Sequence, residues 1–257
     1  MKLINGKEIA AGKLANVKEV VEQLDVEPAL AVVLIGDDPA SHLYVKLKEK
    51  AAKKIGIELR KYTFDKDTVK EEIEKAIEFL NNDKETNGII VQLPLPEHLD
   101  TDEIVSIIEP GKDVDGFHSV NQKKFLDNED CLYPVFPNAI MTLIDSEIKS
   151  LKNKKVVIVG KSDVFDRVMT HAFEVEGASV QFVACREKEE LNTKEQTAIN
   201  EADVLVSACG KKDFVSCDYI SDGTVVIDGG ISGRNIQSAD IDAVGGIIND
   251  AVVVNAP

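Results

Sequence analysis

Hydrophobic and polar residues along the first half of the chain follow two periods, one expected of buried strands and one of amphipathic helices. The runs ALAVVLIG (29–36) and GIIVQLPLP (88–96) are continuously apolar, which is typical of strands buried on both faces of a parallel sheet. The second run ends in two prolines, which stop the strand and fix the loop beyond it. Around these runs the pattern predicts helices at 7–24, within 40–57 and at 69–80, and a strand at 58–62.

Residues 109–137 break this pattern with a long stretch rich in Pro, Gly, Asn and Asp. Long loops inside compact proteins are usually functional segments or linkers, and we interpret this one as both. Beyond it the pattern predicts a helix at 138–151 and strands at 156–160, 179–184, 203–207 and 224–228. Such alternation indicates βαβ units around parallel sheets, which bind ligands at the carboxyl ends of their strands. Gln92 lies at one such end.

Composition narrows the class of protein and its partners. With 44% hydrophobic and 30% charged residues, the chain is typical of globular proteins. The net charge of -16 argues against a nucleic-acid partner, because neutralising phosphates needs clustered Lys and Arg. No apolar run approaches the roughly 18 residues of a membrane span, and the first residues lack the apolar run of a signal peptide, so a cytoplasmic location without membrane contact is expected. The 4 cysteines show no CxxC spacing, so neither a metal site nor a disulfide framework is expected.

The helix predicted within 40–57 carries a lysine on its apolar side. At about 100° per residue, Lys48 shares one arc with Ser41 and Tyr44, while the other lysines of this helix fill the opposite arc. An ammonium group among apolar side chains needs a partner, or its pKa falls toward neutrality, where it can exchange protons. Either the stem of Lys48 packs while its head reaches solvent, or Lys48 transfers protons. With Tyr44 on the same arc, able to share a proton through its hydroxyl, both interpretations stay open.

The second half opens like a nucleotide-binding unit. VVIVGKS places Gly160 at a strand end, followed by Lys161, Ser162 and a helix whose first amides can receive a phosphate. A dinucleotide fingerprint has three glycines and this loop has one, so an α/β turn without a ligand is an equal alternative. After the next strand, VACREK places Arg186 where an NAD-binding unit has an acid. Arg186 suits a 2′-phosphate, so any dinucleotide is expected to be NADP.

Taken together, the motifs resemble those of the methylenetetrahydrofolate dehydrogenase/cyclohydrolase enzymes of one-carbon metabolism. S-x-x-Y-x-x-x-K in a helix, GIIVQLPLP, KDVDGFH and VVIVGKS occur in that family's order and spacing, and the likeness runs from about residue 3 to 231. The resemblance implies an α/β protein with a folate-binding catalytic domain at 1–138 and a Rossmann-like nucleotide-binding domain, with a mostly parallel sheet, at 139–257. Such enzymes oxidise 5,10-methylenetetrahydrofolate with NADP and hydrolyse the methenyl product to 10-formyltetrahydrofolate, commonly as homodimers.

The same resemblance implies a role for each motif residue. Lys48 is expected to be the catalytic lysine, with Gln92 hydrogen-bonded to it and Tyr44 against the pterin-linked ring. Asp115 is expected to bind the donor-rich edge of the pterin, because an ionised carboxylate offers only acceptors. Without the other motifs, Asp115 would be a turn residue of D-x-D-G. The remaining implied contacts are those of Ser41 and Pro94 with the substrate, and those of Gly160, Lys161, Ser162, Arg186 and Ile231 with NADP.

Departures from the family pattern lie almost entirely in the second half. The family's PCTP-like segment followed by a glycine is PVFPNAI here, with Phe136 and Ala139 at small or permissive places. Its phosphate loop, G-R-S-x-x-V-G-x-P, is GKSDVFDRV, with Phe165 and Asp166 in place of Val and Gly. Cys185 stands where a small hydroxyl residue is expected near the 2′-phosphate. The chain ends at VVVNAP, where family members continue through a loop and a final helix, and both a natural absence and a shortened sequence stay open.

Three functions therefore stay open at the level of sequence. They are a bifunctional dehydrogenase/cyclohydrolase, a cyclohydrolase that has lost NADP binding, and a non-catalytic folate-binding or interaction protein. We predict that NADP binds weakly or not at all, because Phe165 adds bulk and Asp166 repels the pyrophosphate. Repulsion of about 1 to 3 kcal/mol would lower the affinity roughly ten- to hundredfold.

Overall fold

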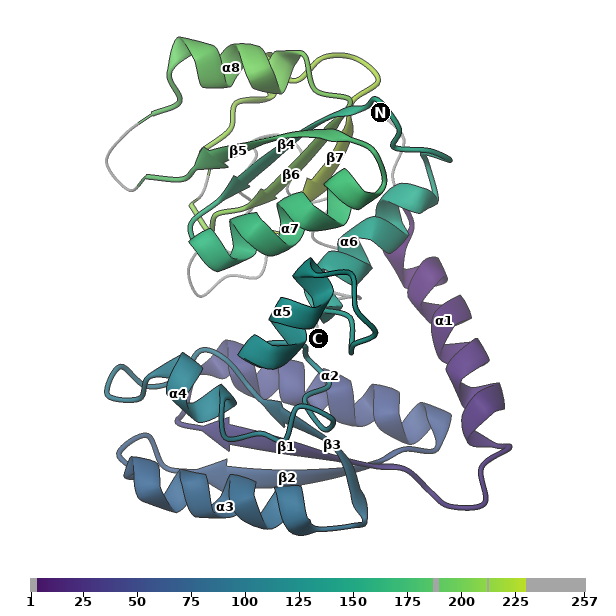
Figure 1. Cartoon of the computed structure of the whole chain (residues 1–257), viewed down its shortest axis with the longest axis vertical. Coiled ribbons are helices and arrows are strands. Elements are labelled where there is room, and N and C mark those ends of the chain that lie inside the picture. The colour runs from purple at the N-terminus through teal and green to yellow at the C-terminus, as the bar shows by residue number, and fades with distance from the viewer. Residues whose placement is uncertain (1–3, 187–189, 212, 230–257) are drawn as a thin grey trace. The chain divides into compact units, whose positions relative to one another are not determined.

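The computed structural model describes residues 4–186, 190–211 and 213–229. The chain divides into two compact units: residues 11–135 form the first, and residues 4–10 join residues 136–229 in the second. Each unit has a parallel sheet, ordered β2-β1-β3 in the first and β5-β4-β6-β7 in the second (Figure 1). The predicted α/β class and parallel strands are confirmed.

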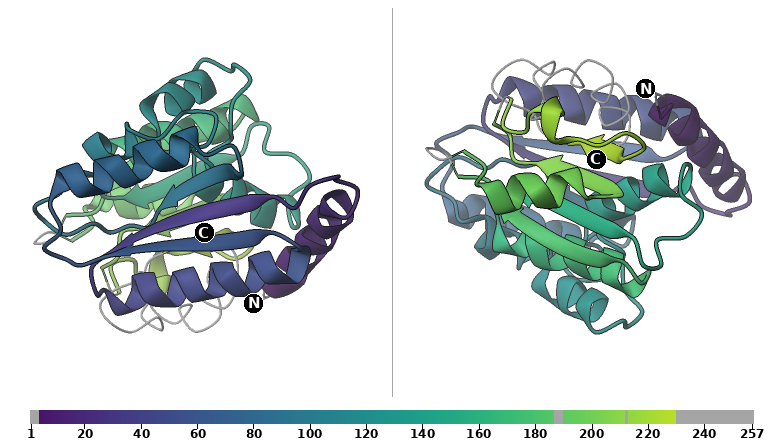
Figure 2. Two further views of the ribbon diagram at one scale, coloured as in Figure 1. Left: turned by 90° about the horizontal axis from the view of Figure 1, so that it is seen from below. Right: turned by 90° about the horizontal axis from the view of Figure 1, so that it is seen from above.

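Strand β1 (Ala29–Ile35) is the centre of the first unit, between β2 (Glu58–Phe64) and β3 (Thr86–Val91). Alternate side chains of β1 enter two separate hydrophobic clusters, one shared with α3 (Lys70–Asn82) and the other with α2 (Pro39–Ile55). These helices lie on opposite faces of the sheet (Figure 2, left). Because both faces of β1 are covered, the strand is apolar without interruption, as the sequence pattern predicted.

The ends of α2, which carries the candidate lysine, are set by local sequence. Asp38 caps the first turn, its carboxylate accepting a hydrogen bond of 2.7 Å from the backbone N–H of Ser41. Pro39 occupies the first helical position, where its missing N–H costs nothing. The helix stops at Gly56, whose φ of 79° is a left-handed conformation that favours glycine.

Several helices differ from the predicted ones. The segment 109–137 is not all loop, because α5 (Ser119–Leu126) lies within it. Its eight residues bury only Asn121 and Phe125, too little apolar periodicity to reveal a helix in the sequence. Helix α6 (Val135–Asp145) begins earlier than the predicted helix at 138–151, because Pro137 is tolerated in a first turn. It also ends earlier than predicted. The remaining helices here are α1 (Gly6–Val21), which ends earlier than predicted, and the short α4 (Thr101–Val105).

In the second unit, β4 (Lys155–Gly160) pairs with β5 (Ser179–Ala184) on one side and with β6 (Val204–Ala208) on the other. The strand that follows β4 in the sequence lies on one side of it, and the next strand lies on the other side, so the strand order reverses at β4. Doubly wound sheets bind their ligands at the carboxyl ends of the strands where the order reverses. Helix α7 (Asp163–Val175) packs on β4 and β5. The unit also contains α8 (Thr193–Asn200), a short 3-10 helix at Cys217–Tyr219 and the edge strand β7 (Val225–Asp228).

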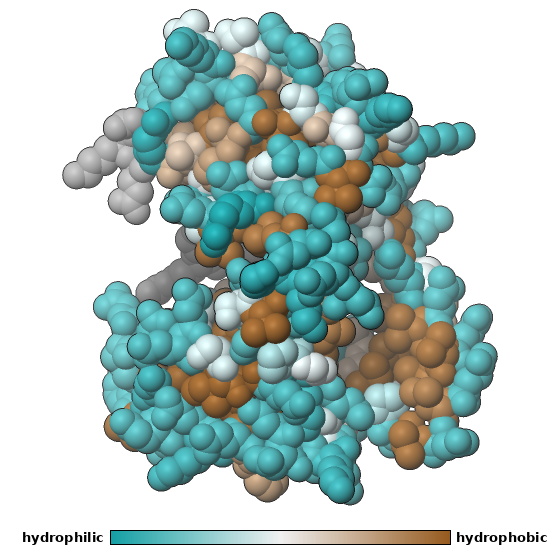
Figure 3. All heavy atoms as spheres, viewed as in Figure 1, coloured by the Kyte–Doolittle hydropathy of each residue, from teal (hydrophilic) through white to brown (hydrophobic). Residues whose placement is uncertain are grey.

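Polar side chains cover most of the face shown in Figure 3. Exposed apolar side chains gather along the last turns of α1 and the turn after it: Val17, Val20, Leu24 and Val26. Across the described ranges, no helix is long and apolar enough to cross a membrane.

Candidate active site

The first unit brings Lys48 and Gln92 into contact. Lys48 lies on the inner side of α2 and is half-buried, whereas Lys46, Lys50 and Lys53 of the same helix are exposed. Its Nζ donates a hydrogen bond of 3.1 Å to Oε1 of Gln92, which directly follows β3. Burial lowers the pKa of Lys48, while the nearby Asp115 carboxylate opposes that shift. The lysine therefore has a neutral hydrogen-bond partner and a reduced cost of losing its proton.

Gln92 is itself held in place by the backbone beyond the strand. Its Nε2 donates to the carbonyl oxygen of Leu93 at 2.8 Å, and the hydroxyl of Ser41 donates to the same oxygen at 3.2 Å. Leu93 and Pro94 are joined by a cis peptide bond, and Pro94 is exposed. These contacts link the first turn of α2 to the end of β3. The amide oxygen of Gln92 is thereby left free to accept from Lys48.

Tyr44 lies on α2 between Ser41 and Lys48. Its hydroxyl oxygen is buried, and no hydrogen-bond partner is found for it among the described residues. Burial raises the pKa of Tyr44, so the hydroxyl keeps its proton at neutral pH. A buried hydroxyl without a partner costs free energy, and a bound ligand that accepts its hydrogen bond would remove that cost.

Asp115 is the acidic member of this site and is only 7% exposed. Burial raises the pKa of its carboxyl group, while Lys48 lowers it and Asp113 raises it. Asp115 sits in a tight turn in which Gly116 has a φ of 73°. A Cβ at Gly116 would lie 2.9 Å from Cα of Pro134, so only glycine fits this turn. Lys48, predicted as the catalytic residue, and Asp115, predicted to bind the substrate, thus influence each other's pKa.

The sequence reasoning missed Asp113, which holds this turn together. Asp113 is 1% exposed, and its carboxylate accepts hydrogen bonds from the backbone N–H groups of Gly116 (3.1 Å) and His118 (2.8 Å). It also accepts one of 3.0 Å from the side-chain amide of Asn121 in α5. The signal was present as the first Asp of D-x-D-G, a residue type that bonds to the backbone ahead of it.

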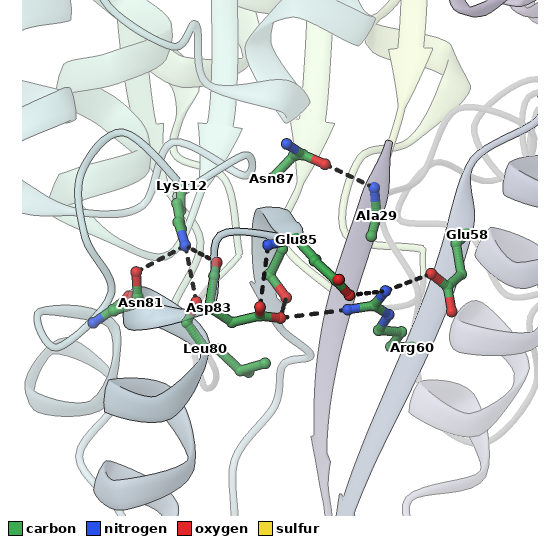
Figure 4. Close-up of polar contacts among 10 residues, drawn as sticks. Ala29, Glu58, Arg60, Leu80, Asn81, Asp83, Glu85, Asn87 and Lys112 are labelled. Atoms are coloured by element: carbon green, nitrogen blue, oxygen red, sulfur yellow. Dashed lines mark hydrogen bonds and ion pairs between the residues drawn. The ribbon is translucent and has the colours of Figure 1, made fainter. Parts of the chain in front are cut away.

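Lys112 anchors the same segment on its other side. Its Nζ donates to the carbonyl oxygens of Leu80 (2.9 Å), Asn81 (2.8 Å) and Asp83 (2.8 Å) at the end of α3 (Figure 4). Its own carbonyl accepts a hydrogen bond of 2.7 Å from the N–H of Ile89 in β3. A cation is favourable at a helix C-terminus, where carbonyl groups lack partners. The turn that carries Asp115 is therefore fixed both to α3 and to β3.

Asp113→Ala is expected to lower the free energy of unfolding by roughly 3 kcal/mol or more, because the buried N–H groups of Gly116 and His118 lose their acceptor and the amide of Asn121 loses one of its two. Chemical denaturation of the variant measures this loss. Asp130→Ala, an exposed carboxylate in the same segment, is the control and is expected to change stability by less than about 0.5 kcal/mol. An Asp113→Ala protein as stable as this control would contradict the anchoring role.

The predicted nucleotide loop is found at the end of β4, and two of the predicted polar side chains, Ser162 and Arg186, already have partners within the protein. Ser162 caps α7, its hydroxyl accepting a hydrogen bond of 3.0 Å from the N–H of Phe165, and Lys161 is exposed. Arg186 forms an ion pair of 2.7 Å with Glu195. Glu195 also belongs to the capping box of α8, a pattern visible in the sequence as N-x-x-E from Asn192. Gly160 is buried, and the remaining predicted contact, Ile231, lies outside the described residues.

Asp166, the residue expected to repel a pyrophosphate, lies in the first turn of α7. Its carboxylate accepts a hydrogen bond of 2.8 Å from the hydroxyl of Thr170, one turn further along α7. An acid in the first turn also stabilises the positive end of the helix. In the described arrangement, the N-terminus of α7 offers amides to a phosphate, whereas Arg186 is neutralised by Glu195. The second unit therefore has the scaffold of a dinucleotide site.

Comparisons with known proteins cover both units. The family descriptions "Tetrahydrofolate dehydrogenase/cyclohydrolase, catalytic domain" and "NAD(P)-binding domain" match residues 4–115 and 134–256. The bifunctional protein FolD of Bacillus subtilis is 41% identical over 233 residues, which is 90% of this chain and 81% of the relative. The FolD of Bacillus thuringiensis is 37% identical over 94% of this chain and 85% of the relative.

A solved structure gives the same result. The FolD methylenetetrahydrofolate dehydrogenase/cyclohydrolase of Campylobacter jejuni has a TM-score of 0.86 and 30% identity, covering 99% of this chain and 95% of that one. The resemblance noted in the sequence motifs is thereby confirmed on both sequence and structure. This chain belongs to the tetrahydrofolate dehydrogenase/cyclohydrolase family.

Proposed function

We propose that this protein oxidises 5,10-methylenetetrahydrofolate with NADP to the methenyl compound and hydrolyses that compound to 10-formyltetrahydrofolate. The observation that carries the proposal is the half-buried Lys48, bonded to Gln92 at 3.1 Å and close enough to Asp115 to influence its charge. Perturbed ionisable groups that face a neutral, oriented partner are typical of sites that move protons. Family membership of both units favours the bifunctional protein over the two alternatives.

Hydrolysis requires water to add to the amidinium carbon of the methenyl substrate and to lose a proton. The neutral amine of Lys48 accepts that proton, since its lowered pKa keeps a fraction of it unprotonated. One N–H of the amine is donated to Gln92, which orients the nitrogen lone pair without adding charge. The resulting ammonium is stabilised by the carboxylate of Asp115.

Substrate binding follows from the groups around Lys48. The Asp115 carboxylate accepts hydrogen bonds from the aminopyrimidine edge of the pterin, and the fixed turn keeps it in place before the substrate arrives. The ring of Tyr44 packs against the substrate, and its unpartnered hydroxyl gains an acceptor. NADP, when bound, would accept the hydride in the oxidation. The first backbone amides of α7 would hold its phosphates, and Arg186 would contribute donors once its ion pair with Glu195 is released.

Two assays on the purified protein test the proposal separately. Loss of the methenyl absorbance without NADP measures hydrolysis, and NADPH formation from the methylene substrate measures oxidation. The bifunctional proposal predicts both activities. Hydrolysis alone would identify a cyclohydrolase, and a folded protein with neither activity would refute the proposal.

We also propose that the protein is a cytoplasmic homodimer. The edge strand β5 supports this assembly, because the sheet order leaves one side of β5 without a neighbouring strand among the described residues and its Val180 and Phe182 are only partly buried. Light scattering at micromolar concentration is expected to give twice the chain mass of 28.1 kDa. A mass of one chain under these conditions would count against the dimer.

A further inference from the structure

We propose that Phe136 and Phe165 together close the nucleotide crevice of the second unit, so that NADP binds only after Phe165 has moved. The inference rests on the proposed function, because it concerns the cofactor of that reaction. It assigns to two aromatic residues the control of cofactor affinity. Neither residue belongs to the polar phosphate-binding set expected from the sequence.

Phe165 fills the space beside the one glycine of the phosphate loop. A Cβ at Gly160 would lie 2.7 Å from Cδ1 of Phe165, so the aromatic ring lies directly against the glycine backbone. Glycine in such a loop serves to let a pyrophosphate approach the backbone closely. Here the space that glycine leaves is taken by a side chain of the protein itself.

Phe136 fills the corresponding space at the end of β7, beside Gly229. A Cβ at Gly229, directly after β7, would lie 3.0 Å from Cζ of Phe136. The rings of Phe136 and Phe165 are in contact, with centroids 5.8 Å apart and planes inclined by 46°. Because β6 lies between β4 and β7 in the sheet, the pair reaches from the carboxyl end of β4 across that of β6 to that of β7. A doubly wound sheet binds its dinucleotide at this switch point.

The two phenylalanines, which both differ from the family pattern, pack against each other. The family pattern has a small or permissive residue at the position of Phe136 and Val at that of Phe165. The rings of both residues meet each other, and Phe165 is half-buried. Asp166, next in the chain, is turned to Thr170 at 2.8 Å. The bulk of the two rings is therefore a barrier to the cofactor in addition to the charge of Asp166.

Calorimetric titration of NADP into the full chain tests the proposal. Phe165→Val restores the family residue and is expected to bind NADP roughly two- to tenfold more tightly than the unmodified protein, because an aromatic contact of about 0.5 to 1.5 kcal/mol is no longer broken on binding. Phe136→Thr removes the other ring and is expected to act in the same direction. Val175→Ala is the control, because Val175 is an exposed apolar residue of the same helix, at the opposite end of α7 from Phe165. Its affinity for NADP should match that of the unmodified protein.

Low-micromolar or tighter binding of NADP to the unmodified protein would overturn the proposal. So would unchanged affinity in a folded Phe165→Val protein, and if that variant does not fold, unchanged affinity in Phe136→Thr decides against it. Equal tightening by Val175→Ala would show a general loosening of the unit and would also overturn it. Hydrolysis of the methenyl substrate without NADP is measured in parallel, so a failed proposed function is distinguished from a failed inference about the crevice.

Discussion

Lys48→Met is expected to slow hydrolysis of 5,10-methenyltetrahydrofolate about 10²- to 10⁴-fold, the usual contribution of one proton-transfer group. Methionine has a similar length and no titrating group, so it keeps the packing of α2 and removes the amine. The hydrogen bond to Gln92 is also lost. Loss of the methenyl absorbance measures the rate, and circular dichroism shows whether the variant is folded.

Lys50→Met is the matched control, since Lys50 lies on the same helix with its side chain exposed. Its hydrolysis rate should stay within a factor of about two, as expected for a surface substitution. A folded Lys48→Met protein that hydrolyses the substrate at the rate of this control would remove Lys48 from the mechanism.

Asp115→Asn is expected to raise the KM for folate substrates roughly ten- to hundredfold. A hydrogen bond to a charged group contributes about 1.5 to 3 kcal/mol, and the amide cannot accept from two donors on the pterin edge as a carboxylate does. Steady-state kinetics of hydrolysis measure the change. Asp130→Asn, an exposed carboxylate from the same segment, is the control and should leave KM unchanged.

The same substitution is expected to move the pH dependence of kcat. Burial lowers the pKa of Lys48, and the Asp115 carboxylate raises it. Removing the carboxylate therefore lowers the pKa of Lys48 further, and the neutral amine is present from a lower pH. The rise of kcat with pH should shift to lower pH in Asp115→Asn. A shift to higher pH would contradict the electrostatic coupling of the two residues.

The part of the site that lies on one element could be predicted from the sequence. The periodicity of α2 placed Lys48 on the inner side, and the apolar runs located β1 and β3, because a single helix or strand carries its own pattern. Gln92 was identified at a strand end, and its contact with Lys48 was implied by the family resemblance and is observed at 3.1 Å.

Contacts between distant segments could not be predicted in the same way. Helix α5 was not predicted because its apolar pattern is weak. The role of Asp113 was not predicted because its three donors come from a turn and from that helix. The engagement of Arg186 by Glu195 depends on where α8 begins. The contact between Phe136 and Phe165 joins two residues that are 29 positions apart in the sequence and lie on different helices. Tertiary packing determines each of these contacts, and the local sequence pattern around the residues does not indicate them.

The most direct test of the account is a titration of Lys48 itself. NMR of protein labelled at the lysine side chains, with the Lys48 signal assigned by its loss in Lys48→Met, measures the pKa of this amine. We predict a pKa below the ordinary value for a lysine, and a rise of kcat for hydrolysis over the same pH range. A Lys48 pKa at or above the ordinary value, with hydrolysis already at its maximum where the amine is fully protonated, would contradict proton transfer by a neutral Lys48.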